Sequence, residues 1–129
     1  MLSTVVTEAG TRHIPLSPTA VAMVASRFRV LGEPVRIRII QELQGGEKSI
    51  SDLVAAIGST QPNVSKHVRI LEEAGIVARR HEGTTVFCSI TDEGVLGVCD
   101  AVCASIGERL ARDAVLVAEL TGRLPDPRG

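Results

Sequence analysis

The chain has 129 residues, a formal net charge of −1 and only two aromatic side chains, Phe28 and Phe87. This length suits one domain with a real hydrophobic core, and the hydrophobic content of 44% argues against global disorder. The apolar runs are too short for a membrane span, and residues 1–10 do not resemble a signal peptide. Three cysteines, an odd number, favour a reduced cytoplasmic protein over a disulfide scaffold. Without Trp or Tyr, base stacking on RNA or single-stranded DNA is nearly excluded.

The charges are unevenly distributed along the chain. Residues 27–80 carry nine basic and six acidic side chains, whereas residues 81–129 carry four basic and eight acidic ones. An ordinary solvated surface can have such a distribution, so charge alone does not identify a partner. A near-neutral total nevertheless leaves room for a basic surface that binds nucleic acid, because the local potential determines binding.

Four helices are predicted in the first half of the chain. Each begins at a capping residue or a proline and ends at a glycine: Ser17-Pro18 to Gly32, Glu33-Pro34 to Gly45-Gly46, Ser49 or Ser51 to Gly58, and Ser59-Thr60 to Gly75. Apolar residues recur at helical spacing and predict one apolar face on each helix: Val21, Val24, Phe28 and Leu31; Val35, Ile39, Ile40 and Leu43; Ile50, Leu53, Val54 and Ile57; Val64, Val68 and Leu71.

After Gly75 the pattern changes to a period of two. Residues 76–81 and 84–90 are predicted to form strands joined by a tight turn at Glu82-Gly83. A long last helix follows a cap at Thr91 or Asp92, with an apolar seam of Val95, Cys99, Val102, Cys103, Ile106 and Leu110. The sequence therefore predicts a mainly α protein with a two-stranded β wing, in the order α-α-α-α-β-β-α. We expect a flexible arm over residues 1–15, one domain over 16–121 and a frayed tail over 122–129.

The segment from Ile50 to Ile90 points to a function. Two short helices joined by Gly58-Ser59-Thr60 form a helix-turn-helix, which places its second helix in the major groove of DNA. That second helix carries amides, hydroxyls and cations away from its apolar face, a mixture that suits base edges and phosphates. The predicted DNA contacts on the helix are Thr60, Gln61, Asn63, Ser65, Lys66 and Arg69, and those on the wing are Arg79, Arg80, His81 and Thr84. A winged-helix module that only docks proteins is the alternative.

Three stretches resemble the ArsR/SmtB family of winged-helix repressors: FRVLGEPVRIRII from Phe28, QPNVSKHVRILEEAGIV from Gln61 and RHEGTTV from Arg80. The resemblance covers residues 17 to 112. It implies a homodimer, paired through the first and last helices, that represses by binding an inverted repeat and is released by an inducer. It also places His67 at the histidine of the family's Ser-x-His motif, where base readout and helix packing or phosphate contact are equally open roles.

Two metal sites of the family are missing their ligands here. The Cys-x-Cys site at the start of the third helix corresponds to Lys48–Asp52, which contains no thiol. In the second site, on the last helix, Asp92 and Glu108 match, but Gly94 and Ser105 replace the histidines. Two carboxylates without imidazole bind zinc-like ions poorly, so a sensor of those types is not expected.

The three thiols remain as candidates for sensing. Cys99 and Cys103 lie four residues apart on the last helix, and Cys88 lies on the second wing strand with Val86 and Ile90. They could be packing residues. They could also bind As(III) or Sb(III) through Cys99 and Cys103, with Cys88 or a partner-chain sulfur as the third ligand, which is the inducer we favour.

Oxidants or reactive sulfur species are the alternative inducers. A direct disulfide within one helix is strained, because i,i+4 Cβ atoms lie ~5–6 Å apart and a disulfide needs ~3.5–4.5 Å. A longer polysulfide bridge or a disulfide across the dimer would avoid this mismatch. An enzyme is not expected, since the chain has neither a Cys-x-x-Cys motif nor a histidine on the cysteine-bearing helix.

Overall fold

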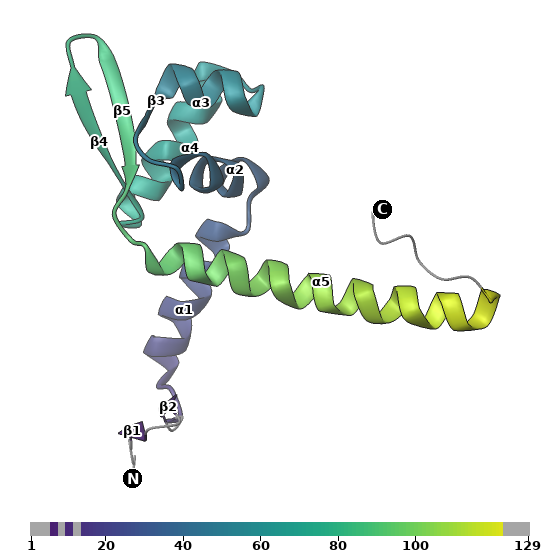
Figure 1. Cartoon of the computed structure of the whole chain (residues 1–129). Coiled ribbons are helices and arrows are strands. Elements are labelled where there is room, and N and C mark those ends of the chain that lie inside the picture. Colours follow the sequence, from purple (N-terminus) through teal and green to yellow (C-terminus); the bar gives the residue numbers. More distant parts are fainter. Residues whose placement is uncertain (1–5, 8–9, 12–13, 123–129) are drawn as a thin grey trace.

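The computed structural model describes residues 6–7, 10–11 and 14–122 (Figure 1). It contains helices α1 (Pro18–Leu31), α2 (Pro34–Leu43), α3 (Ile50–Ile57), α4 (Gln61–Glu73) and α5 (Gly94–Thr121), and strands β1 (Val6–Thr7), β2 (Gly10–Thr11), β3 (Lys48–Ser49), β4 (Val77–Glu82) and β5 (Thr85–Ile90). The predicted fold class, four helices, a β wing and a long last helix, is confirmed. The β1–β2 ladder was not predicted within the expected arm. Most of that arm's side chains and nearly all of the expected tail lie outside the described residues.

Local caps set the helix boundaries. Ser17 Oγ accepts a hydrogen bond from the Ala20 amide at 3.1 Å, and Ser49 rather than Ser51 caps α3 in a reciprocal capping box with Asp52. The predicted cap of α5 is wrong, because the N-cap residue is Glu93, whose side chain makes no capping bond. Asp92, one of the two predicted caps, still bonds to the start of α5, because its Oδ1 accepts a hydrogen bond from the Gly94 amide at 3.1 Å.

The wing is a small antiparallel sheet of order β3-β5-β4. β4 and β5 form the predicted hairpin, and the two residues of β3 pair with the opposite edge of β5. The turn lies at Gly83-Thr84, one residue later than predicted, because Glu82 still pairs with Thr85. Gly83 has a φ of +62°, which suits glycine at the first position of a two-residue hairpin turn.

The core lies between α2, α3, α4 and the sheet. Its residues are Leu31, Ile39, Ile40, Leu43, Ile50, Leu53, Val64, Val68, Leu71, Ile76, Val77, Cys88 and Val95. α1 and α5 each supply one buried residue to it, Leu31 and Val95. The other residues of the apolar face of α1, Val21, Val24 and Phe28, are exposed within one protomer.

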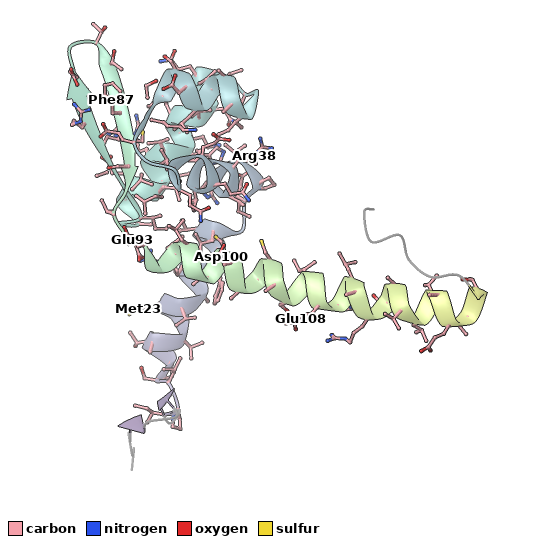
Figure 2. All side chains as sticks on the ribbon, viewed as in Figure 1. Met23, Arg38, Phe87, Glu93, Asp100 and Glu108 are labelled. Carbon is pink, nitrogen blue, oxygen red and sulfur yellow. The ribbon has the colours of Figure 1, made fainter. Side chains whose placement is uncertain are left out.

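The first and last helices project from this body, α1 below it and α5 to one side (Figures 1 and 2). α5 has 28 residues, a length of about 42 Å at 1.5 Å per residue. An ion pair at 3.3 Å between Arg27 and Asp92 joins α1 to the start of α5. In the ranges that the structure describes, no helix is both long and apolar enough to cross a membrane.

Candidate nucleic-acid interface

α3 and α4 form the helix-turn-helix that the sequence predicts. Gly58 ends α3 with a φ of +75°, a left-handed conformation that glycine adopts without strain. Thr60 then caps α4, where its Oγ1 accepts from the Asn63 amide at 3.3 Å. Val64, Val68 and Leu71 fix one face of α4 in the core. The opposite face of α4 is therefore held in a defined orientation toward solvent.

That opposite face carries a row of polar residues. Gln61, Ser65 and Arg69 follow one another at i, i+4 and i+8, so they lie along one side of α4, with Lys66 beside them. Gln61, Lys66 and Arg69 are exposed, and Ser65 is half-buried. Within the described part of the chain, neither Lys66 nor Arg69 has an ion-pair partner. We call Gln61, Ser65, Lys66 and Arg69 the exposed row of α4.

The start of α4 adds a site for anions. The first amides of a helix lack intrahelical acceptors and carry the positive end of the helix dipole. Thr60 and Gln61 lie at this end and are exposed. Such a helix end is suited to phosphate oxygens.

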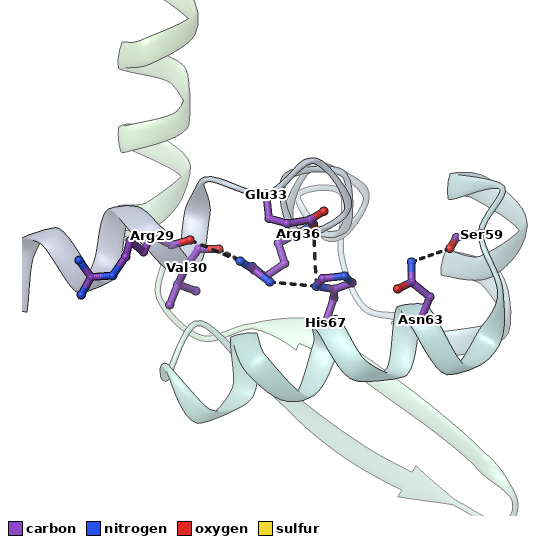
Figure 3. Close-up of polar contacts among 7 residues, drawn as sticks. All are labelled: Arg29, Val30, Glu33, Arg36, Ser59, Asn63 and His67. Carbon is purple, nitrogen blue, oxygen red and sulfur yellow. Dashed lines mark hydrogen bonds and ion pairs between the residues drawn. The ribbon is translucent and has the colours of Figure 1, made fainter.

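Asn63 and His67 lie on the flank of α4 rather than in the exposed row. Asn63 is half-buried, and its Nδ2 donates to Ser59 Oγ at 2.9 Å (Figure 3). This bond occupies one of the amide donors that the sequence assigned to base readout. Asn63 therefore stabilises the turn between α3 and α4 in the free protein.

His67 is 6% exposed and faces α2. Arg36 Nη1 donates to its Nδ1 at 3.0 Å, and Glu33 Oε2 lies 3.7 Å from the same nitrogen (Figure 3). Burial lowers the pKa of His67; the nearby Glu33 carboxylate opposes this shift, and the positive charges of Arg36 and Lys66 add to it. This placement favours helix packing over base readout, because the ring is buried and its Nδ1 already has a partner.

The wing arginines are already paired with carboxylates. Arg79 is half-buried and forms an ion pair at 2.9 Å with Glu72 of α4. Arg80 is exposed, with Nη2 2.6 Å from Glu47 Oε1 and Nη1 2.7 Å from Glu82 Oε2. The hydrogen bond from Arg80 lowers the pKa of Glu47. DNA phosphates would therefore have to compete with these carboxylates for Arg80.

The wing also has an arginine–aromatic contact and two exposed polar residues near its turn. The Arg80 guanidinium also lies over the Phe87 ring, 4.6 Å from its centroid, in a cation–π contact. His81 and Thr84 are exposed near the hairpin turn, as a contact to the DNA backbone or minor groove requires.

The three cysteines differ in their burial. Cys88 is fully buried, and burial raises the pKa of its thiol to about 11. Cys99 is half-buried, with its pKa also raised by burial, and Cys103 is exposed. Among the described residues, no three His, Cys, Asp or Glu side chains form a group that could hold a metal ion. The prediction of Cys88 as an accessible third ligand therefore has no support within one protomer.

Cys99 and Cys103 line the same groove. It has a volume of about 340 Å³ and lies between α1, α2 and α5, with Phe28, Leu31 and Ile106 among its walls. The surroundings of the two thiols are almost entirely apolar. A bound ligand here would contact the last turn of α1 as well as α5.

Three residues of this region were not found from the sequence: Glu33, Arg36 and Glu47. Glu33 caps α2 by accepting from the Arg36 amide at 3.1 Å, and the Glu33-Pro34 pair did signal a helix start. The contacts of Arg36 with His67 and of Glu47 with Arg80 span 31 and 33 residues of sequence. No local pattern encodes such contacts.

Comparisons with known proteins agree with this geometry. A family model described as a helix-turn-helix domain matches residues 31–80. The HTH-type transcriptional regulator KmtR of Mycobacterium tuberculosis is 32% identical over 108 residues, which is 84% of this chain and 74% of that protein.

Two solved structures have a similar fold. One is the homodimeric winged helix-turn-helix DNA-binding domain of Mb0332 from Mycobacterium bovis, described as a possible ArsR-family regulator. It is 25% identical, with a TM-score of 0.65, covering 75% of this chain and 93% of that one. The other is the antimony-specific transcriptional repressor AntR, 25% identical with a TM-score of 0.67, covering 74% of this chain and 86% of that one.

The fold and the exposed row of α4 define a winged helix-turn-helix transcriptional regulator rather than an enzyme. The similarity to KmtR over most of both chains makes the assignment more specific. The chain belongs to the ArsR/SmtB family of transcriptional regulators.

Proposed function

We propose that this protein is a repressor that binds an inverted repeat in double-stranded DNA as a homodimer. The observation that carries the proposal is the exposed row of α4, which presents two polar side chains and two cations without an ion-pair partner among the described residues, on a helix whose apolar face is fixed in the core. α4 is then the recognition helix, and the hairpin lies beside it as a wing. Gln61 and Ser65 would contact base edges or phosphates, while Lys66 and Arg69 would bind phosphates or guanine.

The dimer would form through α1 and α5. Phe28 of α1 and Val102, Ile106 and Leu110 of α5 are all exposed, although such residues are usually buried. A contiguous apolar surface of this kind marks an interface. Mb0332, which has the same fold, is a homodimer. A two-fold axis would place two recognition helices about one DNA turn (~34 Å) apart, which matches an inverted repeat.

The inducer we propose is As(III) or Sb(III), bound by Cys99 and Cys103. Both thiols line the groove beside α1, and soft thiolates select such ions. AntR, a similar structure, is antimony-specific by its name. Because no third ligand is present among the described side chains of one protomer, a partner-chain sulfur or a solvent oxygen would complete the coordination.

Selection of DNA from a random duplex library tests the proposed function directly. We expect the wild-type protein to enrich an inverted repeat and to shift it in a gel, and Lys66→Ala to weaken that shift. Arg109→Ala is the matched control, because it removes the same charge from an exposed position on α5. If no duplex is enriched at low salt, the protein is a winged-helix interaction module instead.

The inducer is tested on the same complex. Antimonite or arsenite should release the DNA from wild-type protein but not from Cys99→Ser or Cys103→Ser. Release by polysulfide alone would replace the metalloid with reactive-sulfur chemistry at the same thiols. An equal response of wild type and both variants would show that neither thiol senses the inducer.

A further inference from the structure

Arg36 connects two parts of the molecule that the proposed function uses separately. At the end of α1, its Nε donates to the Val30 carbonyl at 2.5 Å and its Nη2 donates to the Arg29 carbonyl at 3.3 Å. Its Nη1 donates to His67 Nδ1 on α4 at 3.0 Å. Figure 3 shows this single guanidinium between the last turn of α1 and the flank of α4.

The chemistry of the two side chains makes this link specific. Arginine has only donors, so His67 Nδ1 must be the acceptor, and the proton of the neutral ring is on Nε2. The last carbonyls of α1 have no partner within their helix, and His67 is buried, so each acceptor needs a donor from outside its own helix. The planar fork of Arg36 serves all three acceptors at once, which a lysine ammonium cannot do with the same geometry.

The last turn of α1 also borders the cysteine groove. Phe28 and Leu31 line that groove, while the intervening Arg29 and Val30 present their carbonyls to Arg36. A displacement of this turn therefore changes the groove and the guanidinium contacts together. Glu33 lies on the same side of His67 as Arg36. Its carboxylate caps α2 and is 3.7 Å from His67 Nδ1.

We propose that Arg36 and His67 are positioning residues that fix the recognition helix α4 relative to the last turn of α1. Through this contact, the arrangement of α1 and α5 sets the angle at which the exposed row of α4 meets DNA. The inference rests on the proposed function, because it concerns how that surface is presented. Neither residue needs to touch DNA.

Paired substitutions test this inference, with a duplex selected on wild-type protein as the probe. His67→Leu removes the acceptor, whereas His67→Asn keeps an oxygen near the position of Nδ1. Arg36→Gln removes the fork, and Arg38→Gln removes the same charge from an exposed position on the same helix. We expect about tenfold weaker binding for His67→Leu and Arg36→Gln, the equivalent of about 1.4 kcal/mol. His67→Asn and Arg38→Gln should stay within about twofold of wild type.

Two further readouts separate positioning from stability, with each variant shown by circular dichroism to be folded in the assay. The double variant Arg36→Gln/His67→Leu should bind no more weakly than Arg36→Gln alone, because Arg36→Gln already removes the contact that His67→Leu breaks. Protonation of His67 removes its acceptor, so wild-type binding should weaken as the pH falls below 6.5 more than binding by His67→Asn does. The groups that face the ring in this range are Glu33, Arg36 and Lys66.

The inference is overturned if folded His67→Leu binds like wild type, or if His67→Asn is as weak as His67→Leu. Failure of wild-type protein to enrich any duplex would instead refute the proposed function. Amide hydrogen exchange without DNA then decides the inference: it should be faster in α4 of Arg36→Gln than of Arg38→Gln. Equal exchange in these two variants would contradict it.

Discussion

Substitution of Ile106 by glutamate should dissociate the proposed dimer. Ile106 is 56% exposed in the protomer and lies in the apolar seam of α5, near Val102 and Leu110. Full burial of such a side chain contributes about 1.5–3 kcal/mol, so burying the remaining half contributes about 1 kcal/mol in each protomer. Ile106→Glu removes this contribution twice and places two carboxylates in an apolar interface, which costs several kcal/mol more. We therefore expect the dissociation constant of the dimer to rise by more than about 100-fold.

Sedimentation velocity over a range of protein concentrations measures this effect. Ala104→Glu is the matched control, because residue 104 is exposed and lies on nearly the opposite side of α5 from Ile106. It adds the same charge and should leave the dimer intact. A folded Ile106→Glu protein that dimerises like wild type, or an Ala104→Glu protein that dissociates equally, would refute pairing through this seam.

Three further predictions concern the wing, the buried histidine and the thiols. Glu47→Gln should strengthen duplex binding about threefold, because it removes a competitor for Arg80; unchanged affinity in fluorescence anisotropy would mean that Arg80 does not reach phosphate. The free energy of unfolding should fall as the pH drops below 6.5, because burial lowers the pKa of His67 and the unfolded chain then binds the proton more readily; denaturation of His67→Asn, which lacks this group, should show a shallower dependence over the same range. Iodoacetamide should alkylate Cys88 only after unfolding, as read by mass spectrometry, since Cys88 is fully buried and its pKa is raised to about 11; rapid modification of Cys88 in the folded protein would contradict its placement.

Much of the fold could be predicted because its signals are local. Ser17, Ser49 and Thr60 cap their helices through side chains that bond to amides three residues away. The alternation in β5 and the Gly83 turn likewise depend on neighbouring residues. The turn was misplaced by one residue because the pattern does not fix the register of the hairpin, which Glu82 and Thr85 determine by pairing.

The environment of each face could not be predicted from periodicity. Phe28 and Val64 both lie on apolar helical stripes, but Phe28 is exposed and Val64 is fully buried. The stripe identifies an apolar face without showing whether this protomer or another molecule covers it. The role of His67 stayed open for a related reason: it lies at the border between the apolar and polar sides of α4, where only the position of α2 decides its partner.

The ion pairs of Arg80 were also not predicted from the sequence. Lys66 and Arg80 both counted as candidate DNA contacts, yet Arg80 has two carboxylate partners, and the structure shows none for Lys66 among the residues it describes. Glu47 lies 33 residues before Arg80 in the sequence, whereas Glu82 lies two residues after it, on the same face of β4. The exposed row of α4 was nevertheless predictable, because it follows from helical spacing opposite the core residues.

The salt dependence of duplex binding tests the proposed DNA interface most directly. For a duplex selected on the wild-type protein, the logarithm of the association constant should fall linearly with the logarithm of salt concentration. If Lys66 contacts one phosphate in each protomer, Lys66→Ala should make this slope shallower by about 1.8, at about 0.9 per phosphate. Arg109→Ala should leave the slope unchanged. An identical slope for Lys66→Ala and wild type would contradict the placement of the exposed row of α4 against DNA.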